Sequence, residues 1–258
     1  AHEYADPLDR RFHAQPVACT VCGPQVWFQT VGGRISEGED AIQVARSYLK
    51  AGKIVALKGL GGFHLACDAT NPSAIIELRR RKRREEKPFA VMVKDLAAAD
   101  ACVVADPRER TLLSSPAAPI VLLPRRENAV DGTRVAEAVA PGNPRLGIML
   151  AYTPLHHLLL DALGRGVVAT SGNLSDEPIV IDEVEALARL RGVASLFLVH
   201  NRPIARPVDD SVAQMAAGNP MILRCARGYA PLTIDAGIEL PSAICVGAHL
   251  KNSVGSEE

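Results

Sequence analysis

The chain has 258 residues, of which 48% are hydrophobic and 22% are charged, a composition typical of globular proteins and not of disordered or fibrous ones. Lys plus Arg and Asp plus Glu number 29 each, so the formal net charge is zero, which excludes the overall basicity that drives nonspecific binding to nucleic acids. The longest apolar runs, such as residues 120–123, are far shorter than the roughly 20 residues of a membrane span. Residues 1–13 carry charges throughout, which argues against a signal peptide.

The six cysteines are too few for a disulfide scaffold, and four of them stand alone among apolar residues. This pattern predicts a reduced, cytoplasmic protein. Cys19 and Cys22 form the single C-x-x-C pair and are followed by Gly23 and Pro24, as in a metal knuckle. A tetrahedral zinc site needs two such pairs, so we expect half of a Zn²⁺ site here.

The N-terminal third of the chain changes character near residue 36. Residues 1–35 are rich in Pro, Gly and charge and have no sustained helical or strand period, which predicts an appendage outside the core. From Glu39 a helical pattern runs to Gly52, a residue suited to a C-terminal cap. Strands are predicted at 53–58, 63–67 and 89–93, and Asn71-Pro72 predicts the start of a helix that runs through Arg84.

The remaining pattern alternates short apolar strands with helices. Strands are predicted at 120–123, 146–150, 167–170, 196–199, 212–215 and 221–223, and helices at about 95–101, 107–115, 154–163 and 182–191. This order indicates an α/β domain with a mixed sheet, and the closely spaced last two strands indicate an antiparallel portion. Residues 236–258 leave the pattern with a linker and a new strand-like start, ICVGAHLKNSV. We therefore expect the chain to be a piece of a longer protein.

Six consecutive cations, Arg79 to Arg84, precede Glu85, Glu86, Lys87 and Pro88 and then an apolar strand. One interpretation is a solvated helix end whose cations complement the helix dipole. The other is a ligand site, because K-x-R-x-x-K-P leads directly into a buried strand and so places long cationic side chains at a sheet edge. Phosphates are the natural ligands of such a cluster. Position along the chain favours the second interpretation.

Three other segments combine turn residues with polar side chains. Thr170-Ser171-Gly172-Asn173 follows a strand, and its hydroxyl, amide and backbone N–H groups suit an anion as well as an ordinary turn. Residues 58–64, KGLGGFH, are glycine-rich but match neither the P-loop nor the dinucleotide fingerprint.

The third segment, HNRPIARPVDDSV, carries carboxylates beside arginines that could hold magnesium or neutralise one another, and Arg224 and Arg227 follow the last strand. None of the histidines is predicted to be a catalytic base. The His156-His157 pair lies in an apolar helix, where one ring is expected to be packed.

Taken in order, these elements resemble the YrdC-like domain, and most closely that of the HypF-type carbamoyltransferases that mature NiFe hydrogenases. The K-x-R-x-x-K-P signature falls on Lys82, Arg84, Lys87 and Pro88, and the S-x-N signature falls on Ser171 and Asn173. The wording of KGLGGFHLACDA, RRFHAQPVACTVCGP, HNRPIARPVDDSV and RCARGYAP also resembles that family. The related threonylcarbamoyl-adenylate synthases carry T-x-T-x-Y-G-L where this chain has KGLGGFHL, so no threonine pocket is expected.

The resemblance implies a twisted mixed sheet with flanking helices and a concave basic cavity. It implies that residues 1–35 are the C-terminal half of a zinc-finger module in which Cys19 and Cys22 are metal ligands. Residues 36–235 would be the YrdC-like nucleotide-binding domain, and 236–258 a linker with the start of an ASKHA-type transfer domain. An acylphosphatase-like domain of the family is absent from the sequence.

The resemblance further implies a reaction. Carbamate released from carbamoyl phosphate attacks the α-phosphorus of ATP to give carbamoyl-adenylate and pyrophosphate, and the transfer domain passes the carbamoyl group to the C-terminal cysteine of a hydrogenase maturation partner, as the precursor of the cyanide ligands. Because carbamate is already an anion, the chemistry needs cations and positioning and not a general base.

The candidate site residues follow from this chemistry. Lys58, Lys82, Arg84 and Lys87 would screen carbamate and triphosphate, and Ser171 and Asn173 would orient phosphate oxygens. Weaker candidates on the opposite wall are Arg206, Asp210, Ser211 and Arg224. Mg²⁺ is expected to bridge the phosphates, with Asp209 and Asp210 as candidate ligands.

Two alternatives remain. One is a double-stranded-RNA-binding module of the same fold, against which the zero net charge and the 4% of aromatic residues argue. The other is an O-carbamoyltransferase of antibiotic biosynthesis, which shares the adenylation step and differs in the acceptor. The C-x-x-C pair favours the hydrogenase branch.

Overall fold

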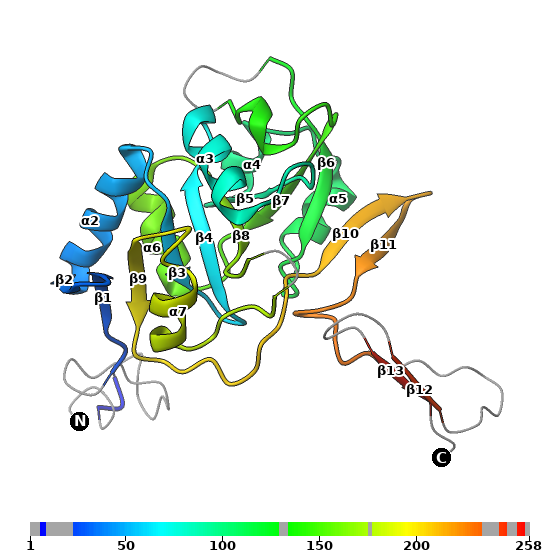
Figure 1. Ribbon diagram of the computed structural model, residues 1–258. Helices are drawn as coiled ribbons and strands as arrows, with labels where there is room; N and C mark the ends of the chain where they lie inside the picture. The colour runs from blue at the N-terminus through cyan, green and yellow to red at the C-terminus, as the bar shows by residue number, and fades with distance from the viewer. Residues whose placement is uncertain are drawn as a thin grey trace.

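The computed structural model describes residues 6–8, 23–128, 134–174, 177–233, 243–246 and 252–255. Its centre is a twisted sheet of 11 strands in the order β11-β10-β6-β7-β5-β8-β4-β3-β9-β1-β2 (Figure 1). The sheet is mixed, since the pairs β3–β9, β5–β7 and β6–β10 are parallel and the others are antiparallel. The strands are β1 Val26–Thr30, β2 Gly33–Glu37, β3 Val55–Lys58, β4 Phe63–Asp68, β5 Ala90–Val93, β6 Ile120–Pro124, β7 Arg145–Leu150, β8 Val167–Ser171, β9 Leu196–His200, β10 Val212–Ala216 and β11 Asn219–Arg224.

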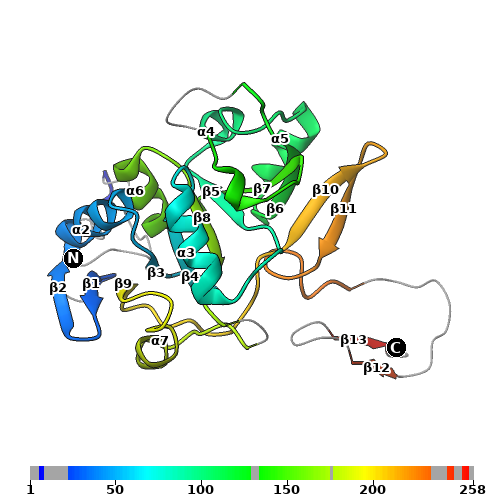
Figure 2. The ribbon, with the colours of Figure 1, turned by 45° about the horizontal axis from the view of Figure 1, so that its top comes forward.

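Helices cover both faces of the sheet, as an α/β domain requires (Figure 2). Helices α2 (Gly38–Lys50) and α6 (Pro154–Leu163) pack on one face through residues such as Leu49 and Leu159. The other face carries α3 (Pro72–Lys82), α4 (Leu96–Asp100), α5 (Pro107–Leu113), α7 (Glu183–Arg189) and the short 3-10 helix η1 (Glu137–Val139). Strands buried on both faces contribute side chains to both layers. In β4, Phe63 and Leu65 pack on the side of α3, and Ala66 packs on the side of α2 and α6.

Most predicted elements are confirmed within two residues of their predicted ends. Helix α3 begins as expected, because the Asn71 side chain accepts a hydrogen bond from the Ala74 amide at 3.1 Å and Pro72 occupies the first turn. It ends at Lys82, two residues before the predicted end, because Arg83 adopts a left-handed conformation with φ of 54°. The backbone therefore turns away from the helix axis before Arg84.

The expectation that residues up to 35 lie outside the core is wrong for β1. This strand pairs antiparallel with β9, and Trp27 and Phe28 are buried in the core. A strand buried on both faces shows no alternation of apolar and polar residues. The buried polar residue of this strand, Gln29, is accommodated because its side chain accepts a hydrogen bond from Trp27 Nε1 at 2.9 Å. The sequence pattern therefore gave no sign of a strand.

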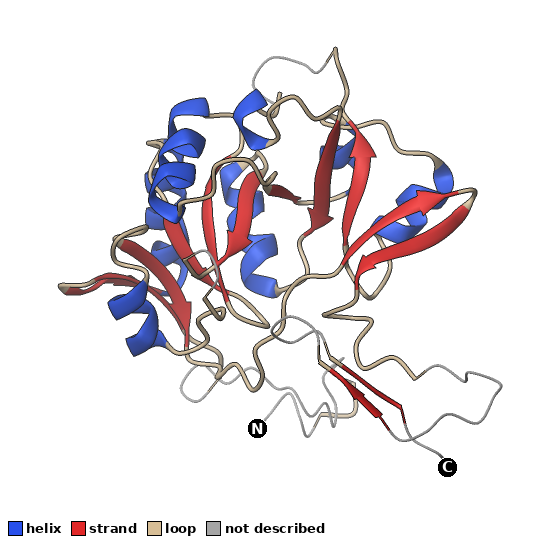
Figure 3. Ribbon diagram, turned by 45° about the vertical axis from the view of Figure 1, so that its right-hand side comes forward, coloured by secondary structure: helices blue, strands red, loops and turns tan. Residues whose placement is uncertain are grey.

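The C-terminal strands behave differently from the rest of the sheet. The β10–β11 hairpin is antiparallel, as predicted, but joins β6 at only two register positions and projects beyond its neighbours (Figure 3). Strands β12 (Ala243–Cys245) and β13 (Ser253–Gly255) pair with each other in a separate sheet.

Cys19 and Cys22 lie outside the described residues. Within the described ranges, no helix is long and apolar enough to cross a membrane.

Candidate functional site

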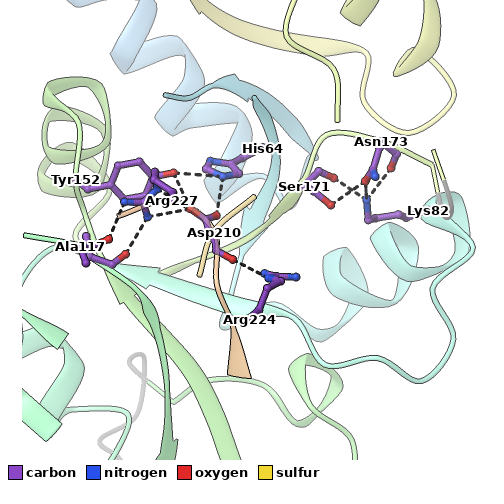
Figure 4. A network of polar contacts seen from close by, with 10 residues as sticks. His64, Lys82, Ala117, Tyr152, Ser171, Asn173, Asp210, Arg224 and Arg227 are labelled. Atoms are coloured by element: carbon purple, nitrogen blue, oxygen red, sulfur yellow. Dashed lines mark hydrogen bonds and ion pairs between the residues drawn. The ribbon is translucent and has the colours of Figure 1, made fainter. Parts of the chain in front are cut away.

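The K-x-R and S-x-N motifs, about 90 residues apart in the sequence, are joined by the side chain of Lys82 (Figure 4). Lys82 Nζ donates hydrogen bonds to the carbonyl oxygens of Ser171 and Asn173, both at 2.6 Å, and to Asn173 Oδ1 at 2.7 Å. Ser171 Oγ donates to the same Asn173 Oδ1 at 2.8 Å. The end of α3 is thereby attached to the loop that follows β8.

Lys82 does not project into solvent, as a ligand-screening cation would. Its side chain is only 2% exposed, and its ammonium hydrogens are directed at protein acceptors. Burial and the nearby Arg84 lower the pKa of Lys82 to about 7. Lys82 therefore shapes the S-x-N loop, and its charge at neutral pH is sensitive to any anion that binds beside it.

The S-x-N loop is also fixed from behind by Gly172. The Gly172 amide donates to the Phe63 carbonyl oxygen at 2.6 Å, and its own carbonyl accepts from the Val180 amide at 2.9 Å. A Cβ atom at this position would lie 2.6 Å from Phe63 Cβ and 2.7 Å from the Phe63 carbonyl oxygen. Only glycine permits this close approach of β4, so the turn residues serve backbone packing as well as polarity.

A cavity of about 420 Å³ opens between these two motifs. It is lined by Lys82, Arg83, Arg84, Glu85, Glu86, Lys87, Ser171 and Asn173. The loop that carries most of these residues is held by Arg79, whose Nη1 donates to the carbonyl oxygens of Arg84, Glu85 and Lys87, each at 3.1 Å. One member of the cation run therefore supports the loop, whereas Arg80 and Arg81 form ion pairs with Glu77.

A second cavity of about 330 Å³ shares Arg84 and Ser171 with the first. Its lining is partly apolar, with Phe89, Ile120, Leu122 and Ile179, and partly polar, with His64, Asn143, Arg145, Asp209, Asp210 and Arg224. Burial and the charges of Arg79 and Arg224 lower the pKa of Arg84. Arg84 thus stands at the junction of the two cavities, where cations gather with too little negative charge to balance them.

The far wall of the second cavity holds a buried polar network centred on Asp210 (Figure 4). Asp210 Oδ1 accepts hydrogen bonds from Tyr152 Oη and from Arg227, and Asp210 Oδ2 lies 3.2 Å from His64 Nε2. The Arg227 guanidinium also stacks on the Tyr152 ring at 3.7 Å from its centroid. Sequence reasoning missed Tyr152, because a lone tyrosine after a strand carries no motif.

The two adjacent histidines of α6 have different surroundings. His156 is 1% exposed, and burial together with the charge of His64 lowers its pKa to about 3. His157, its neighbour, is exposed. The prediction that one of the pair is packed is therefore confirmed.

Three predicted site residues lie away from these cavities. Lys58 is buried, and its ammonium donates to Glu183 and to the His200 carbonyl oxygen. Ser211 is buried immediately before β10, where its hydroxyl donates to the Arg227 carbonyl oxygen and accepts from the Ala226 amide. Arg206 is exposed and lines neither cavity. The remaining candidates, Lys82, Arg84, Lys87, Ser171, Asn173, Asp210 and Arg224, surround the two cavities.

Asp210 is a poor candidate for a magnesium ligand. Its Oδ1 accepts hydrogen bonds from Tyr152 and Arg227 and its Oδ2 faces His64, so both oxygens already have protein partners. Among the described residues, no group of three or more His, Cys, Asp or Glu side chains could hold a metal ion.

Residues 47–226 match the family model described as Sua5, YciO and YrdC, "Telomere recombination". The chain belongs to the Sua5/YciO/YrdC family. Residues 1–29 match a second family model, the HypF finger, which contains Cys19 and Cys22 and ends within β1.

Several proteins similar to this chain have names that state an enzymatic activity. Carbamoyltransferase HypF of Rhodobacter capsulatus is 51% identical over 254 residues, which are 96% of this chain and 33% of that protein. Carbamoyltransferase HypF of Synechocystis is 52% identical over 226 residues, 86% of this chain and 29% of that protein. Threonylcarbamoyl-AMP synthase of Stenotrophomonas maltophilia is 30% identical over 146 residues, 54% of this chain and 75% of that protein. The chain thus spans about a third of the length of the HypF relatives.

Solved structures agree with this assignment. The crystal structure of full-length HypF in a phosphate- and nucleotide-bound form is 46% identical, with a TM-score of 0.79 over 89% of this chain and 29% of that one. The structure of Sua5 from P. abyssi in complex with L-threonine is 18% identical, with a TM-score of 0.65 over 74% of this chain and 56% of that one, and supports the fold alone.

Proposed function

We propose that this chain binds ATP across the two joined cavities and forms carbamoyl-adenylate from ATP and carbamate. The observation that carries the proposal is the convergence of Arg84, Lys87 and the S-x-N loop on one cavity that adjoins a partly apolar second one. A nucleotide matches this pair of cavities, one polar and one partly apolar, since its phosphates are anionic and its base is flat and largely apolar. The HypF relative that was solved with phosphate and nucleotide supports this choice of ligand.

The proposed chemistry assigns each cavity a part of the ligand. The β- and γ-phosphates occupy the first cavity, beside Arg84, Lys87 and Asn173, and the nucleoside occupies the second, against Phe89 and Ile120. Arg84 lines both cavities, so it is placed to contact the α-phosphate between them. A carbamate oxygen then forms a bond to the α-phosphorus, and the bond from that phosphorus to the bridging oxygen breaks. Pyrophosphate leaves with the electron pair.

No proton has to be removed from carbamate in this step, so the proposed chemistry needs no general base. The main barrier is the repulsion between the anionic nucleophile and the triphosphate, which fixed cations reduce. Mg²⁺ would add to this screening from the phosphate side. Because Asp210 does not fit as its ligand, no step is assigned to the metal.

The wider role is proposed from the HypF relatives, of which this chain covers about a third. There the carbamoyl group would pass to a C-terminal cysteine of a hydrogenase maturation partner. Residues 1–25 would be the end of a zinc finger with Cys19 and Cys22 as ligands. Residues 26–235, which include β1 and β2 of the sheet, would be the adenylating domain, and 236–258 the entry to a transfer domain. The match of residues 1–29 to the HypF finger supports the hydrogenase branch over an antibiotic O-carbamoyltransferase.

The test is exchange of labelled pyrophosphate into ATP by the purified chain. We expect exchange that requires carbamoyl phosphate with an acylphosphatase, or bicarbonate with ammonia, as the carbamate source. L-threonine with bicarbonate serves as the control and is expected to give none. ATP binding without exchange under any carbamate source would contradict adenylate formation by this chain. Retention of double-stranded RNA in place of ATP, abolished by salt, would favour the RNA-binding alternative.

ATP affinity is expected to fall as the pH rises above 7. Lys82 has a pKa of about 7 in the free chain, and a bound triphosphate favours its protonated form, so binding takes up a proton wherever Lys82 is neutral. Between pH 7.5 and 9.0, where the phosphates are already ionised, the Kd should rise about 10-fold to 25-fold. Calorimetry in buffers of different ionisation enthalpy would measure the proton uptake.

Unfolding of the free chain, measured over the same pH range, provides the control, because the Lys82 contribution to stability has the opposite sign. The folded-state pKa of Lys82 lies below its unfolded value, so over this range the unfolded state binds more protons and the Lys82 contribution to stability rises with pH. Weaker binding at high pH is therefore not caused by unfolding. A Kd for ATP that stays constant from pH 7.5 to 9.0 would contradict the coupling between triphosphate binding and protonation of Lys82.

A further inference from the structure

Asp210 brings together four side chains from different parts of the fold. Its carboxylate accepts from Arg227 Nε at 3.1 Å, from Arg227 Nη2 at 2.9 Å and from Tyr152 Oη at 3.2 Å, and His64 Nε2 lies 3.2 Å from Oδ2. Its main-chain carbonyl oxygen accepts from Arg224 Nε at 2.8 Å. His64 lies on β4, Tyr152 follows β7, and the two arginines lie at the end of β11 and beyond it.

Both oxygens of the carboxylate have hydrogen-bond partners, and the group stays ionised. Burial acts to raise the pKa of Asp210, but the hydrogen bonds and positive charges of His64 and Arg227 outweigh it and hold the pKa well below its usual range. A largely buried carboxylate with protein partners on both oxygens has little capacity to bind a ligand. Its position is nevertheless tightly determined, because four contacts from three elements converge on it.

Arg224 is the residue through which this position reaches the cavity. Arg224 lines the second cavity together with Arg84, and its charge helps to lower the pKa of Arg84. Among the described residues, its Nε has one acceptor, the Asp210 carbonyl oxygen, and its Nη atoms have none. Arg227, by contrast, is tied down by Asp210 and by the carbonyl oxygens of Ala117 and Ala118. The guanidinium of Arg227 is therefore fully engaged within the network, whereas that of Arg224 is held through Nε alone.

We propose that Asp210, clamped by His64, Tyr152 and Arg227, is a positioning residue that aims the Nη edge of Arg224 at the phosphates of the bound nucleotide. The identity of the ligand rests on the proposed function. The physical advantage is preorganisation: the guanidinium is oriented through a main-chain carbonyl and is not neutralised by a carboxylate partner of its own. The base of the β10–β11 hairpin holds both residues, because Asp210 lies two residues before β10 and Arg224 ends β11.

The positioning can be tested without any nucleotide, by NMR of the chain labelled with ¹⁵N-arginine. The Nε–H of Arg224, assigned by its loss in Arg224→Met, should exchange slowly with water because it is hydrogen bonded. In Asp210→Asn, and in the milder Tyr152→Phe, we expect exchange at least about tenfold faster. Asp161→Asn is the matched control, since Asp161 forms only an exposed ion pair with Lys94. Unchanged exchange in both network variants would overturn the proposal.

The functional part is tested by ATP binding in a double-mutant cycle. Asp210→Asn and Tyr152→Phe should each raise the Kd for ATP, by about tenfold and about threefold, in the parent chain and leave it unchanged in the Arg224→Met background. Equal losses in both backgrounds would show that the network acts only on stability, and would overturn the proposal. If the parent chain binds no ATP, the proposed function fails, whereas the NMR measurement still decides whether Asp210 positions Arg224.

Discussion

Replacing Arg84 with methionine is expected to lower ATP–pyrophosphate exchange by at least about 100-fold while the chain remains folded. Arg84 lines both cavities and is held over the Phe89 ring by hydrogen bonds from Nε to the Lys87 carbonyl and from Nη2 to the Pro88 carbonyl. Charge-assisted hydrogen bonds to phosphate contribute about 1.5–3 kcal/mol each. Loss of a contact that strengthens as pyrophosphate leaves should therefore lower the turnover and not only the affinity.

Arg80→Met is the matched control for this prediction. Arg80 belongs to the same run of cations, but its side chain is exposed and pairs with Glu77 on the outer side of α3. The substitution removes the same charge from the same run of cations, so any general loss of attraction for ATP would appear in both variants. We expect exchange within about twofold of the parent chain, as is usual for an exposed ion pair. Similar losses in Arg80→Met and Arg84→Met would contradict a specific site at Arg84.

Replacing Lys82 with methionine is expected to lower both stability and activity. The substitution removes the Lys82 donor from the Ser171 carbonyl, the Asn173 carbonyl and Asn173 Oδ1. The Ser171 carbonyl keeps the Asn173 amide and Oδ1 keeps the Ser171 hydroxyl, whereas the Asn173 carbonyl loses its side-chain donor. An unsatisfied buried acceptor costs about 1–3 kcal/mol, and partial relaxation of the loop should leave a net loss of about 2–4 kcal/mol in the free energy of unfolding. Because the S-x-N loop then loses its shape, exchange should fall more than about 100-fold in protein that is still folded. Urea denaturation and exchange measured on the same sample check both effects.

Lys58→Met separates a loss of stability from a loss of the site. Lys58 is as deeply buried as Lys82, and its removal leaves Glu183 and the His200 carbonyl without a partner. We expect a similar loss of stability, reduced somewhat because Glu183 is partly exposed. Exchange by the folded protein should stay within about threefold of the parent chain. Abolished exchange in folded Lys58→Met would place Lys58 in the site after all, as its position in the sequence motif first indicated.

The different roles of Lys58 and Lys82 could not be predicted from the sequence. Both stand at the end of a regular element beside a motif, and nothing in their local sequence distinguishes them. The partners of Lys58 lie 125 and 142 residues further along the chain, and those of Lys82 lie 89 and 91 residues away. Which lysine supports the S-x-N loop and which pins α7 to the sheet is decided by long-range packing alone.

What the sequence determined by itself was local. Capping residues, glycine turns and short apolar runs defined nearly every helix and strand, because these preferences depend on neighbours within a few residues. The motifs likewise identified the cation run and the S-x-N turn. The tertiary structure alone decided that β1 belongs to the sheet, that Arg79 holds the loop behind Arg84, and that Asp210 is held by His64, Tyr152 and Arg227. The physical reason is that burial and hydrogen-bond saturation depend on segments that meet only when the sheet assembles, so no local pattern reports them.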